Sequence, residues 1–435
     1  MNPFQKLKAM NREHLAWYLY DFGNSAYAAV VLLAVYSAYF KGTVVGGAEG
    51  TRLWGISVGV AMLIVAISSP ILGAIADFSA SKKRLLLLFS GMTWLFTGLL
   101  FFVQKGDILI GMLFFILAEI GYRSGQVFYN SLLPEIAEPE EMGRVSGNAW
   151  AIGSFGGILA LLILLPMILS IEGDIMVRFS MVFTSVYFAL STIPTMLWIK
   201  EKAEPKPIPA GKNYLTVGFS QLVETIKSLG GFKDFIRFMI AFLVYNDGIL
   251  MALDFAAIIG AVLFGMKQKE IIIFMIVVQV FSVIGAWGSG VAGDKIGFKR
   301  SLIYSLLLMI IAIIAMIFAQ NQVHFYIIGA LAGLALTGVQ SISRAMIGYF
   351  APKDKSAEFY GLFAVTGRTS SFIGPTFYGF LAAQMAWWFE AQGKATLLAE
   401  QYGQRVAIGS IAIFLIAGLL ILLKVKDPTE KYINS

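Results

Sequence analysis

Long apolar stretches separated by short polar segments run along the whole chain. A hydrocarbon core about 30 Å thick is crossed by roughly 20 helical residues of this kind. Twelve stretches reach that length, near residues 17–40, 54–77, 85–103, 108–129, 146–171, 177–199, 236–264, 270–293, 301–319, 323–349, 357–386 and 405–424. None shows the alternation of apolar and polar residues that is typical of a transmembrane β-barrel. The pattern therefore predicts an all-α integral membrane protein with twelve transmembrane helices.

Composition supports this class and excludes several others. The 435 residues are 58% hydrophobic and 14% charged, which is more apolar surface than a soluble domain of this size could bury. The net charge of +7 is spread over short connections, so we expect no nucleic-acid partner. Without cysteine, with two distant histidines and with no phosphate-binding glycine loop, we expect no metal site, no cofactor and no enzymatic activity.

Orientation follows from the Lys and Arg residues in the connections. Most of them lie before the first stretch, after the last one, or in alternate connections that then share one side of the membrane. Because basic residues accumulate on the cytoplasmic side, we expect both termini there. The first apolar stretch is too long for a signal-peptide core, so no cleaved signal is expected. We expect a monomer in a lipid bilayer, a bacterial inner membrane.

A charged, proline-rich connection near the midpoint divides the chain. It predicts an N-terminal six-helix bundle over 1–199, a cytoplasmic linker over 200–235 and a C-terminal six-helix bundle over 236–435. Apolar residues recur at helical spacing late in the linker, which favours an amphipathic helix on the membrane surface over a loosely ordered loop.

The two halves also repeat a short motif. GAIADFSASKKR (73–84) and GVAGDKIGFKR (290–300) each follow the second stretch of their half, with an aspartate four residues after a glycine and a basic cluster at the end. Internal repeats of this kind are typical of secondary transporters. Glycines in GSFGG (153–157) and GPTFYG (374–379) further predict helices that cross closely.

The repeated loop resembles that of the major facilitator superfamily, although Ser79 and Ala80 stand near a position where glycine is usual. YDFGNSAYAAVV in the first stretch, YNDG (245–248), and long segments around the fourth, fifth, tenth and eleventh stretches resemble one branch. That branch contains the autophagy-related vacuolar amino-acid effluxers and their bacterial relatives. The resemblance implies two pseudo-symmetric six-helix bundles, alternating access and a cytoplasmic latch. The candidate latch residues are Asp77, Arg84, Asp294 and Arg300, and the alternative is a pair of solvated turns that anchor the topology.

Seven charged residues fall inside the apolar stretches. Each would cost several kcal/mol against lipid. Four acids and three bases nearly balance, which suggests pairing around a water-filled cavity. All but one lie on the first, fourth, seventh and tenth stretches, which line the central cavity by the same resemblance. They are Asp21, Glu119, Arg123, Asp247, Asp254, Arg344 and Arg368.

Polar neighbours extend these positions into stripes on one helix face. Glu119 and Arg123 are either part of a solute site or a structural ion pair. Asp21 is either a gate contact or a solute or proton group. Asp247 has no basic residue one turn away, so it is the leading candidate for a proton or a substrate ammonium group. The remaining candidates for the solute site are Asn24, Tyr27, Gln126, Tyr245 and Gln340, although Tyr in a transmembrane helix often serves packing alone.

Together these features predict a secondary active transporter for a small polar solute. A neutral amino acid is the first candidate, with export favoured and with proton coupling or movement down a gradient both open. One alternative is an organic-anion transporter that uses Arg123, Arg344 and Arg368. A second is a membrane sensor that keeps the fold without transport. The acidic run that begins at Glu135 is expected to be a solvated face near basic loops.

Overall fold

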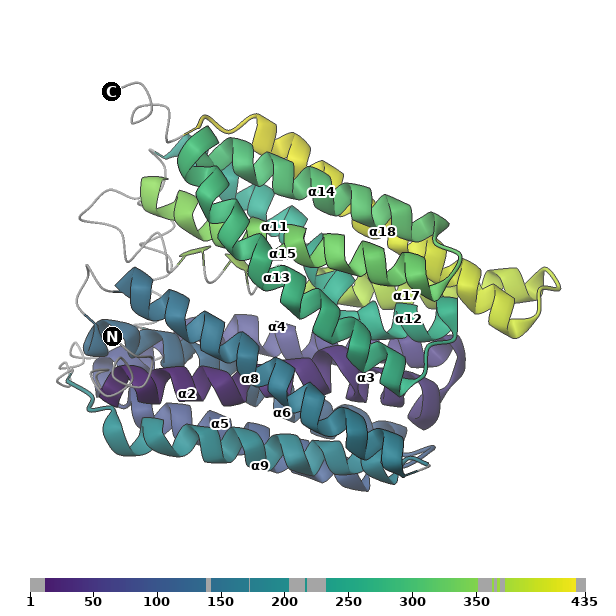
Figure 1. Cartoon of the computed structure of the whole chain (residues 1–435), viewed down its shortest axis with the longest axis horizontal. Helices are drawn as coiled ribbons and strands as arrows, with labels where there is room; N and C mark the ends of the chain where they lie inside the picture. Colours follow the sequence, from purple (N-terminus) through teal and green to yellow (C-terminus); the bar gives the residue numbers. More distant parts are fainter. Residues whose placement is uncertain are drawn as a thin grey trace. The chain divides into compact units, whose positions relative to one another are not determined.

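The computed structural model of the chain describes residues 12–137, 142–171, 173–202, 216, 232–350, 362–363, 366–367 and 372–427. Within these ranges every regular element is a helix, and no strand occurs (Figure 1). This confirms the all-α prediction.

Long helices account for most of the described residues. They are α2 (Arg12–Tyr27), α4 (Gly47–Ser79), α5 (Lys82–Leu99), α6 (Ile108–Ser131), α8 (Met142–Ser170), α9 (Ile175–Trp198), α11 (Lys233–Asp254), α13 (Gln268–Ile296), α14 (Phe298–Phe318), α15 (Gln322–Phe350), α17 (Ile373–Ala391) and α18 (Thr396–Leu423). Short elements extend or connect them: η1 (Ala28–Ala34), α3 (Tyr36–Tyr39), η2 (Phe40–Val45), η3 (Leu100–Phe102), α7 (Leu133–Ile136) and α12 (Ala256–Phe264).

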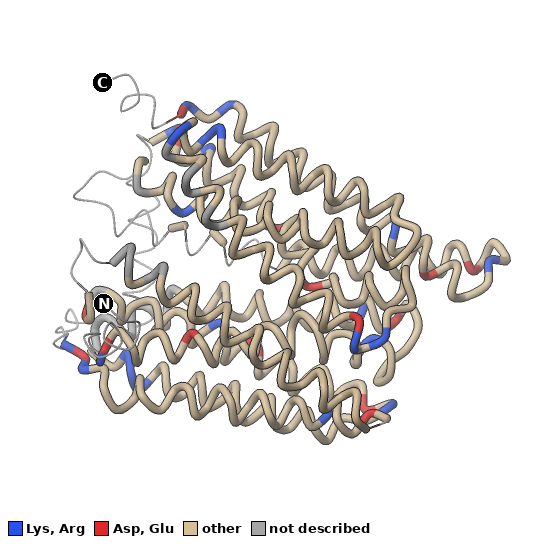
Figure 2. The backbone as a smooth tube through the Cα atoms, viewed as in Figure 1, with Lys and Arg blue, Asp and Glu red and all other residues tan. Residues whose placement is uncertain are grey.

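Eleven helical segments of the described chain are long and apolar enough to cross a membrane. The stretch expected at 357–386 is described only in part, and its helix α17 runs on to Ala391. A count of twelve therefore stays a prediction. The amphipathic helix expected within 200–235 lies almost wholly outside the described residues. Figure 2 shows charged residues gathered toward helix ends and connections, with few in the helix middles, as a bilayer requires.

The first transmembrane segment is less regular than its sequence predicts. Instead of one α-helix over 17–40, it consists of α2, the π-helical turns η1, the short α3 and the π-helical η2, which ends at Val45. π-Helical turns hold an extra residue per turn and often lie at functional sites. The extra residues change which side chains lie on a given face of the segment beyond α2.

The seventh segment, expected as one helix over 236–264, is broken at Phe255 into α11 and α12. Phe255 has φ −108° and ψ 0°, outside the α-helical region. The indole N–H of Trp54 donates to the carbonyl oxygen of Asp254 at 2.9 Å. In a continuous helix the Asp254 carbonyl would accept a hydrogen bond from the backbone N–H four residues later. The Trp54 indole takes the place of that donor at the break.

The chain forms two compact units. Unit 1 contains residues 1–32, 67–103 and 109–222, and unit 2 contains residues 33–66, 104–108 and 223–435. Both units use corresponding helix pairs. In unit 1 α2 packs against α8 and α9, and α5 packs against α9; in unit 2 α11 packs against α17 and α18, and α14 packs against α18. These pairs repeat after six membrane segments, which agrees with the internal sequence repeat.

The two copies of the repeated loop turn differently. Gly297, between α13 and α14, has φ 90°, a conformation that glycine adopts without strain. In the first copy Ala80 has φ 47° and is the one non-glycine residue of the described chain with a positive φ. The sequence departure in the first loop therefore places a side chain in the left-handed region.

Candidate functional site

A buried carboxylate organises the polar centre of unit 1. Glu119 in α6 has no exposed surface. Its Oε1 accepts a hydrogen bond from Arg123 Nε at 2.7 Å, one turn along the same helix. Its Oε2 accepts a hydrogen bond from the hydroxyl of Tyr27 at 3.0 Å, from the end of α2. Glu119 and Arg123 therefore form an ion pair, one of the two alternatives for this spacing, and a residue of the first segment joins it. A role in a solute site stays a prediction.

Aromatic rings surround this cluster. Tyr122 lies 4.6 Å from the ring of Tyr27, and the Arg123 guanidinium lies 5.1 Å from the Tyr122 ring centre. Gln126 lies one turn after Tyr122 on the same helix. Asn24 is buried on α2, and its Oδ1 has no hydrogen-bond partner among the described residues. The centre of unit 1 thus combines a compensated charge pair with an amide oxygen that is open to a donor.

Asp21 packs against the glycine-rich part of α8. A Cβ atom built on Gly153 would lie 2.5 Å from Asp21 Oδ2. Gly156 approaches the backbone of Phe22 with similar closeness. The close crossing expected from GSFGG is confirmed, and Asp21 faces a neighbouring helix.

Unit 2 holds a related cluster without a charge pair. Gln340 in α15 donates from Nε2 to Asn246 Oδ1 in α11 at 2.8 Å. The hydroxyls of Tyr245 and Ser343 share a hydrogen bond of 2.7 Å between the same two helices. The tenth-segment stripe was expected to contain Gln340; Ser343 was missed because nothing in its local sequence marks it.

The acid of this unit lies apart from that amide pair. Asp247 in α11 is 1% exposed. Its Oδ1 accepts a hydrogen bond from the backbone N–H of Gly374 at 3.0 Å, in the first turn of α17. Its Oδ2 is buried and has no hydrogen-bond partner among the described residues. A helix N-terminus offers unused N–H groups and a positive dipole end, so α17 favours an anion here.

The other predicted site residues are more scattered. Asp254 is buried at the end of α11, where its carbonyl binds Trp54. Arg344 is exposed on α15. Arg368 lies outside the described residues. The positions of Asp254 and Arg344 leave their roles as predictions.

The candidate latch residues lie where the sequence placed them along the chain. Asp77 and Asp294 belong to the last turns of α4 and α13, and their side chains lie outside the description. Arg84 and Arg300 belong to the first turns of the helices that follow, and both are exposed. Their latch role stays a prediction.

A different set of charges is joined beside the first loop. Lys82 Nζ pairs with Glu135 Oε1 at 2.6 Å, with 7% of the Glu135 side chain exposed. Glu201 accepts from the backbone N–H groups of Lys82 and Lys83 at 2.7 and 3.3 Å, and so caps α5. The backbone N–H of Lys202 reaches Glu135 Oε2 at 2.6 Å. The expectation that Glu135 is solvated is wrong, because the basic loop and the start of the linker enclose it.

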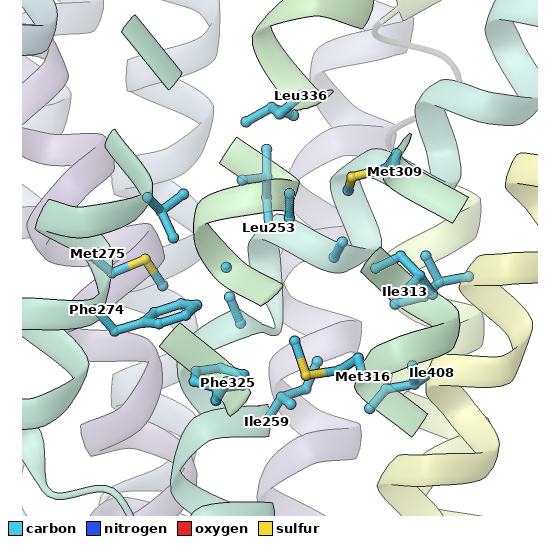
Figure 3. Close-up of a pocket in the computed structure, with 16 residues that line it drawn as sticks. Leu253, Ile259, Phe274, Met275, Met309, Ile313, Met316, Phe325, Leu336 and Ile408 are labelled. Carbon is cyan, nitrogen blue, oxygen red and sulfur yellow. The ribbon is translucent and has the colours of Figure 1, made fainter. Parts of the chain in front are cut away.

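A cavity in unit 2 is apolar, and none of the polar groups described above lines it. It has about 60 Å³ of free space among α11, α12, α13, α14, α15 and α18. Figure 3 shows Phe274, Met275, Met309 and Met316 among the side chains around it. None of its lining residues is charged, so this cavity offers no partner to a polar solute.

The helical architecture and the buried polar clusters define a class. The fold is that of major facilitator transporters. A bacterial homolog of the human lysosomal transporter Spinster has a TM-score of 0.70 at 14% identity, with 99% of this chain and 98% of that chain covered. The nucleoside transporter NupG has a TM-score of 0.67 at 14% identity, with 95% and 99% covered. These two likenesses show the fold of the chain.

Sequence comparison specifies the family. The chain belongs to the family described as vacuole effluxer Atg22 like, whose model matches residues 53–385. An uncharacterized MFS-type transporter of Bacillus subtilis, YxiO, is 25% identical over 98% of this chain and 97% of its own length. Autophagy-related protein 22 of Coccidioides immitis is 24% identical over 74% of this chain and 66% of its own length. The resemblance inferred from the motifs is confirmed.

Proposed function

We propose that the protein exports a small zwitterionic solute, a neutral amino acid, by alternating access and couples that movement to protons through Asp247. The observation that carries the proposal is the carboxyl group of Asp247. One of its oxygens is fixed by the Gly374 N–H, and the other is buried without a partner among the described residues. A lone oxygen of this kind is a binding position for a proton or for the ammonium group of a solute.

The charge balance in unit 1 supports a zwitterion over an organic anion. Arg123 is neutralised by Glu119, so it offers little excess positive charge to an anionic solute. The open Oδ1 of Asn24 supports a solute with a hydrogen-bond donor. Export is supported by the family's description as an effluxer, and alternating access by the inward-facing state of the Spinster homolog.

Binding and transport in purified protein test the proposal. A thermal-shift screen against amino acids, organic anions and sugars is expected to show stabilisation by neutral amino acids. In proteoliposomes, a proton gradient is expected to drive uptake or release of the same solute. Stabilisation by organic anions alone would instead favour the arginine-based alternative, and binding without flux under any gradient would favour a sensor.

Replacement of Asp247 by Asn tests the role of its carboxyl group in proton coupling while keeping the shape of the side chain. Asp247→Asn keeps the size of the side chain and can still accept the Gly374 hydrogen bond, but it cannot release a proton. Proton-driven flux is expected to fall at least tenfold, while exchange of solute across the membrane continues. Asp234→Asn is the matched control, since Asp234 begins the same helix and pairs with Arg237 at 3.2 Å on a more exposed surface. Unchanged proton-driven flux in Asp247→Asn would remove the coupling role.

A further inference from the structure

Residues 33–66 come from the first two membrane segments, yet they pack as part of unit 2 with helices from the second half of the chain. We call these residues the strap. The strap comprises the end of η1, then α3 and η2, and the first part of α4. By the predicted topology its central turn, at Gly46 and Gly47, faces the outside.

One buried ion pair joins the strap to α18 in the same unit. Lys41 Nζ lies 2.7 Å from Glu400 Oε2, at the start of α18. The two side chains are only 11% and 10% exposed. Removal of one charge from such a pair leaves the other charge buried and uncompensated. The free-energy cost of that buried charge falls when water reaches it.

The remaining contacts of the strap are one cation–π contact, uncharged hydrogen bonds and close glycine contacts. The Arg52 guanidinium lies 5.5 Å from the centre of the Phe380 ring in α17. Gln404, one turn after Glu400, donates from Nε2 to Thr51 Oγ1 at 3.2 Å. A Cβ atom on Gly55 would lie 2.5 Å from the carbonyl oxygen of Pro375 in α17, and Gly59 approaches Thr376 more closely still. Small residues at such crossings allow two helices to meet without interlocked side chains, so the surfaces separate without repacking.

Both ends of the strap coincide with irregular helix. Its first boundary, between Leu32 and Leu33, falls inside the π-helical η1. Its second boundary, after Ala66, falls inside α4 four residues before Pro70. A proline has no N–H, so Pro70 cannot donate to the Ala66 carbonyl, and the helix is weakened at that turn. A π-helical turn and a proline turn are common positions for helix bending.

We propose that the strap is a two-hinged gate and that the Lys41–Glu400 ion pair holds it shut against the rest of unit 2. In the shut state the pair is dry and compensated. In the open state both charges are hydrated, and the strap bends at η1 and near Pro70. The proposal rests on alternating access, but it predicts an opening equilibrium that can be measured without any solute.

The natural absence of cysteine makes a single reporter possible. Thr51→Cys places a thiol at the buried contact with Gln404, and a membrane-impermeant maleimide added from either side of sealed membranes reports how often that contact opens. Lys41→Gln and Glu400→Gln in this background are each expected to raise the labelling rate at least about tenfold, from the predicted outer side. The exchanged pair K41E/E400K is expected to return the rate to near its starting value.

Lys394→Gln is the matched control, because Lys394 lies in the connection before α18, six residues from Glu400, and is exposed. It removes a lysine charge on the same predicted side of the membrane and is expected to leave labelling unchanged. An equal rise in Lys394→Gln, or no rise in either variant of the pair, would overturn the proposal. If a single variant elutes as an aggregate in size-exclusion chromatography, the labelling rate of the exchanged pair K41E/E400K is used in its place. A folded exchanged pair that does not restore protection of Thr51→Cys would also overturn the proposal.

Discussion

Helices α2 in unit 1 and α11 in unit 2 carry related motifs, YDFG (20–23) and YNDG (245–248), on similar scaffolds but with different charges. In each unit the tyrosine hydroxyl meets a serine: Tyr20 lies 3.0 Å from Ser90, and Tyr245 lies 2.7 Å from Ser343. In each unit the aspartate of the motif packs against a glycine, Gly153 of α8 for Asp21 and Gly374 of α17 for Asp247. The surrounding packing is therefore repeated, although the partners of the charged groups are not.

The difference lies in where each unit keeps its acid. In α6 the positions four apart are Glu119 and Arg123, which pair; in α15 the corresponding spacing holds Gln340 and Arg344. Unit 2 replaces the carboxylate by an amide that binds Asn246. In unit 2 the carboxyl group of Asp247 lies on α11 and is bound by the N-terminus of α17. The charge of Glu119 is therefore compensated by Arg123, whereas Oδ2 of Asp247 has no partner among the described residues. An equivalent scaffold can thus serve as a rigid charge pair or as a titratable position.

Glu119→Ala is expected to have the largest effect on stability. It removes the carboxylate that pairs with Arg123 and accepts from Tyr27, for a loss of about 3 kcal/mol in the free energy of unfolding. Gln340→Ala in unit 2 removes one neutral hydrogen bond and is expected to cost about 1 kcal/mol. Denaturation in mixed detergent micelles measures both. Similar losses in the two units would contradict the contrast, whereas E119A/R123A is expected to recover part of the larger loss.

Alanine at the two glycines that face the acids is expected to cost about 2 kcal/mol at each site. The Cβ in Gly374→Ala would lie 2.7 Å from Asp247 Oδ1, and that in Gly153→Ala would lie 2.5 Å from Asp21 Oδ2. The same unfolding measurement applies. We expect the two variants to differ in transport: Gly374→Ala also displaces the proposed coupling carboxyl and reduces proton-driven flux. Gly409→Ala is the control, because a Cβ there meets nothing within 4 Å.

Removal of single tyrosine hydroxyls sharpens the comparison further. The Tyr27 hydroxyl donates to a charged group, whereas the Tyr245 hydroxyl meets another hydroxyl. Tyr27→Phe is therefore expected to cost about 2 kcal/mol and Tyr245→Phe about 1 kcal/mol, since bonds to charged groups are the stronger ones. Thermal unfolding in detergent ranks the two variants. The reverse order would mean that Glu119 is satisfied by Arg123 alone.

The smallest effect is expected at the repeated loops. Ala80→Gly removes the strain of a positive φ and is expected to stabilise the protein by about 0.5 kcal/mol, whereas Gly297→Ala introduces that strain and is expected to destabilise it by about 1 kcal/mol. The shift in the midpoint of thermal unfolding should have opposite signs. Two shifts of the same sign would show that the loops tolerate side chains equally.

Several features of the fold could be predicted because they depend on short-range pattern. Hydropathy located the long helices, and the four-residue spacing of Glu119 and Arg123 allowed an ion pair as one of two alternatives. Glycine clusters predicted the close approach of α8 to α2. Each of these inferences uses residues within one or two helical turns, where sequence spacing fixes geometry.

Other features could not be predicted because they depend on contacts between distant segments. Lys41 reads as a loop residue, yet it is buried because Glu400 meets it from the other end of the chain. The break at Phe255 has no proline or glycine to announce it. The bond from Gly374 to Asp247 depends on where α17 begins. A pattern within one segment contains no information about which neighbour competes for its polar groups.

The contacts of Glu201 and Lys202 determine where the polypeptide can be divided. These two residues follow α9, and they are bound to the start of α5 and to Glu135. An N-terminal fragment that stops at Lys200 would lose the cap on α5 and one hydrogen-bond donor to Glu135, whereas one that continues past Lys202 keeps both. Co-expression of the chain as two complementary pieces should therefore succeed with a junction beyond Lys202 and give less protein with a junction before Glu201.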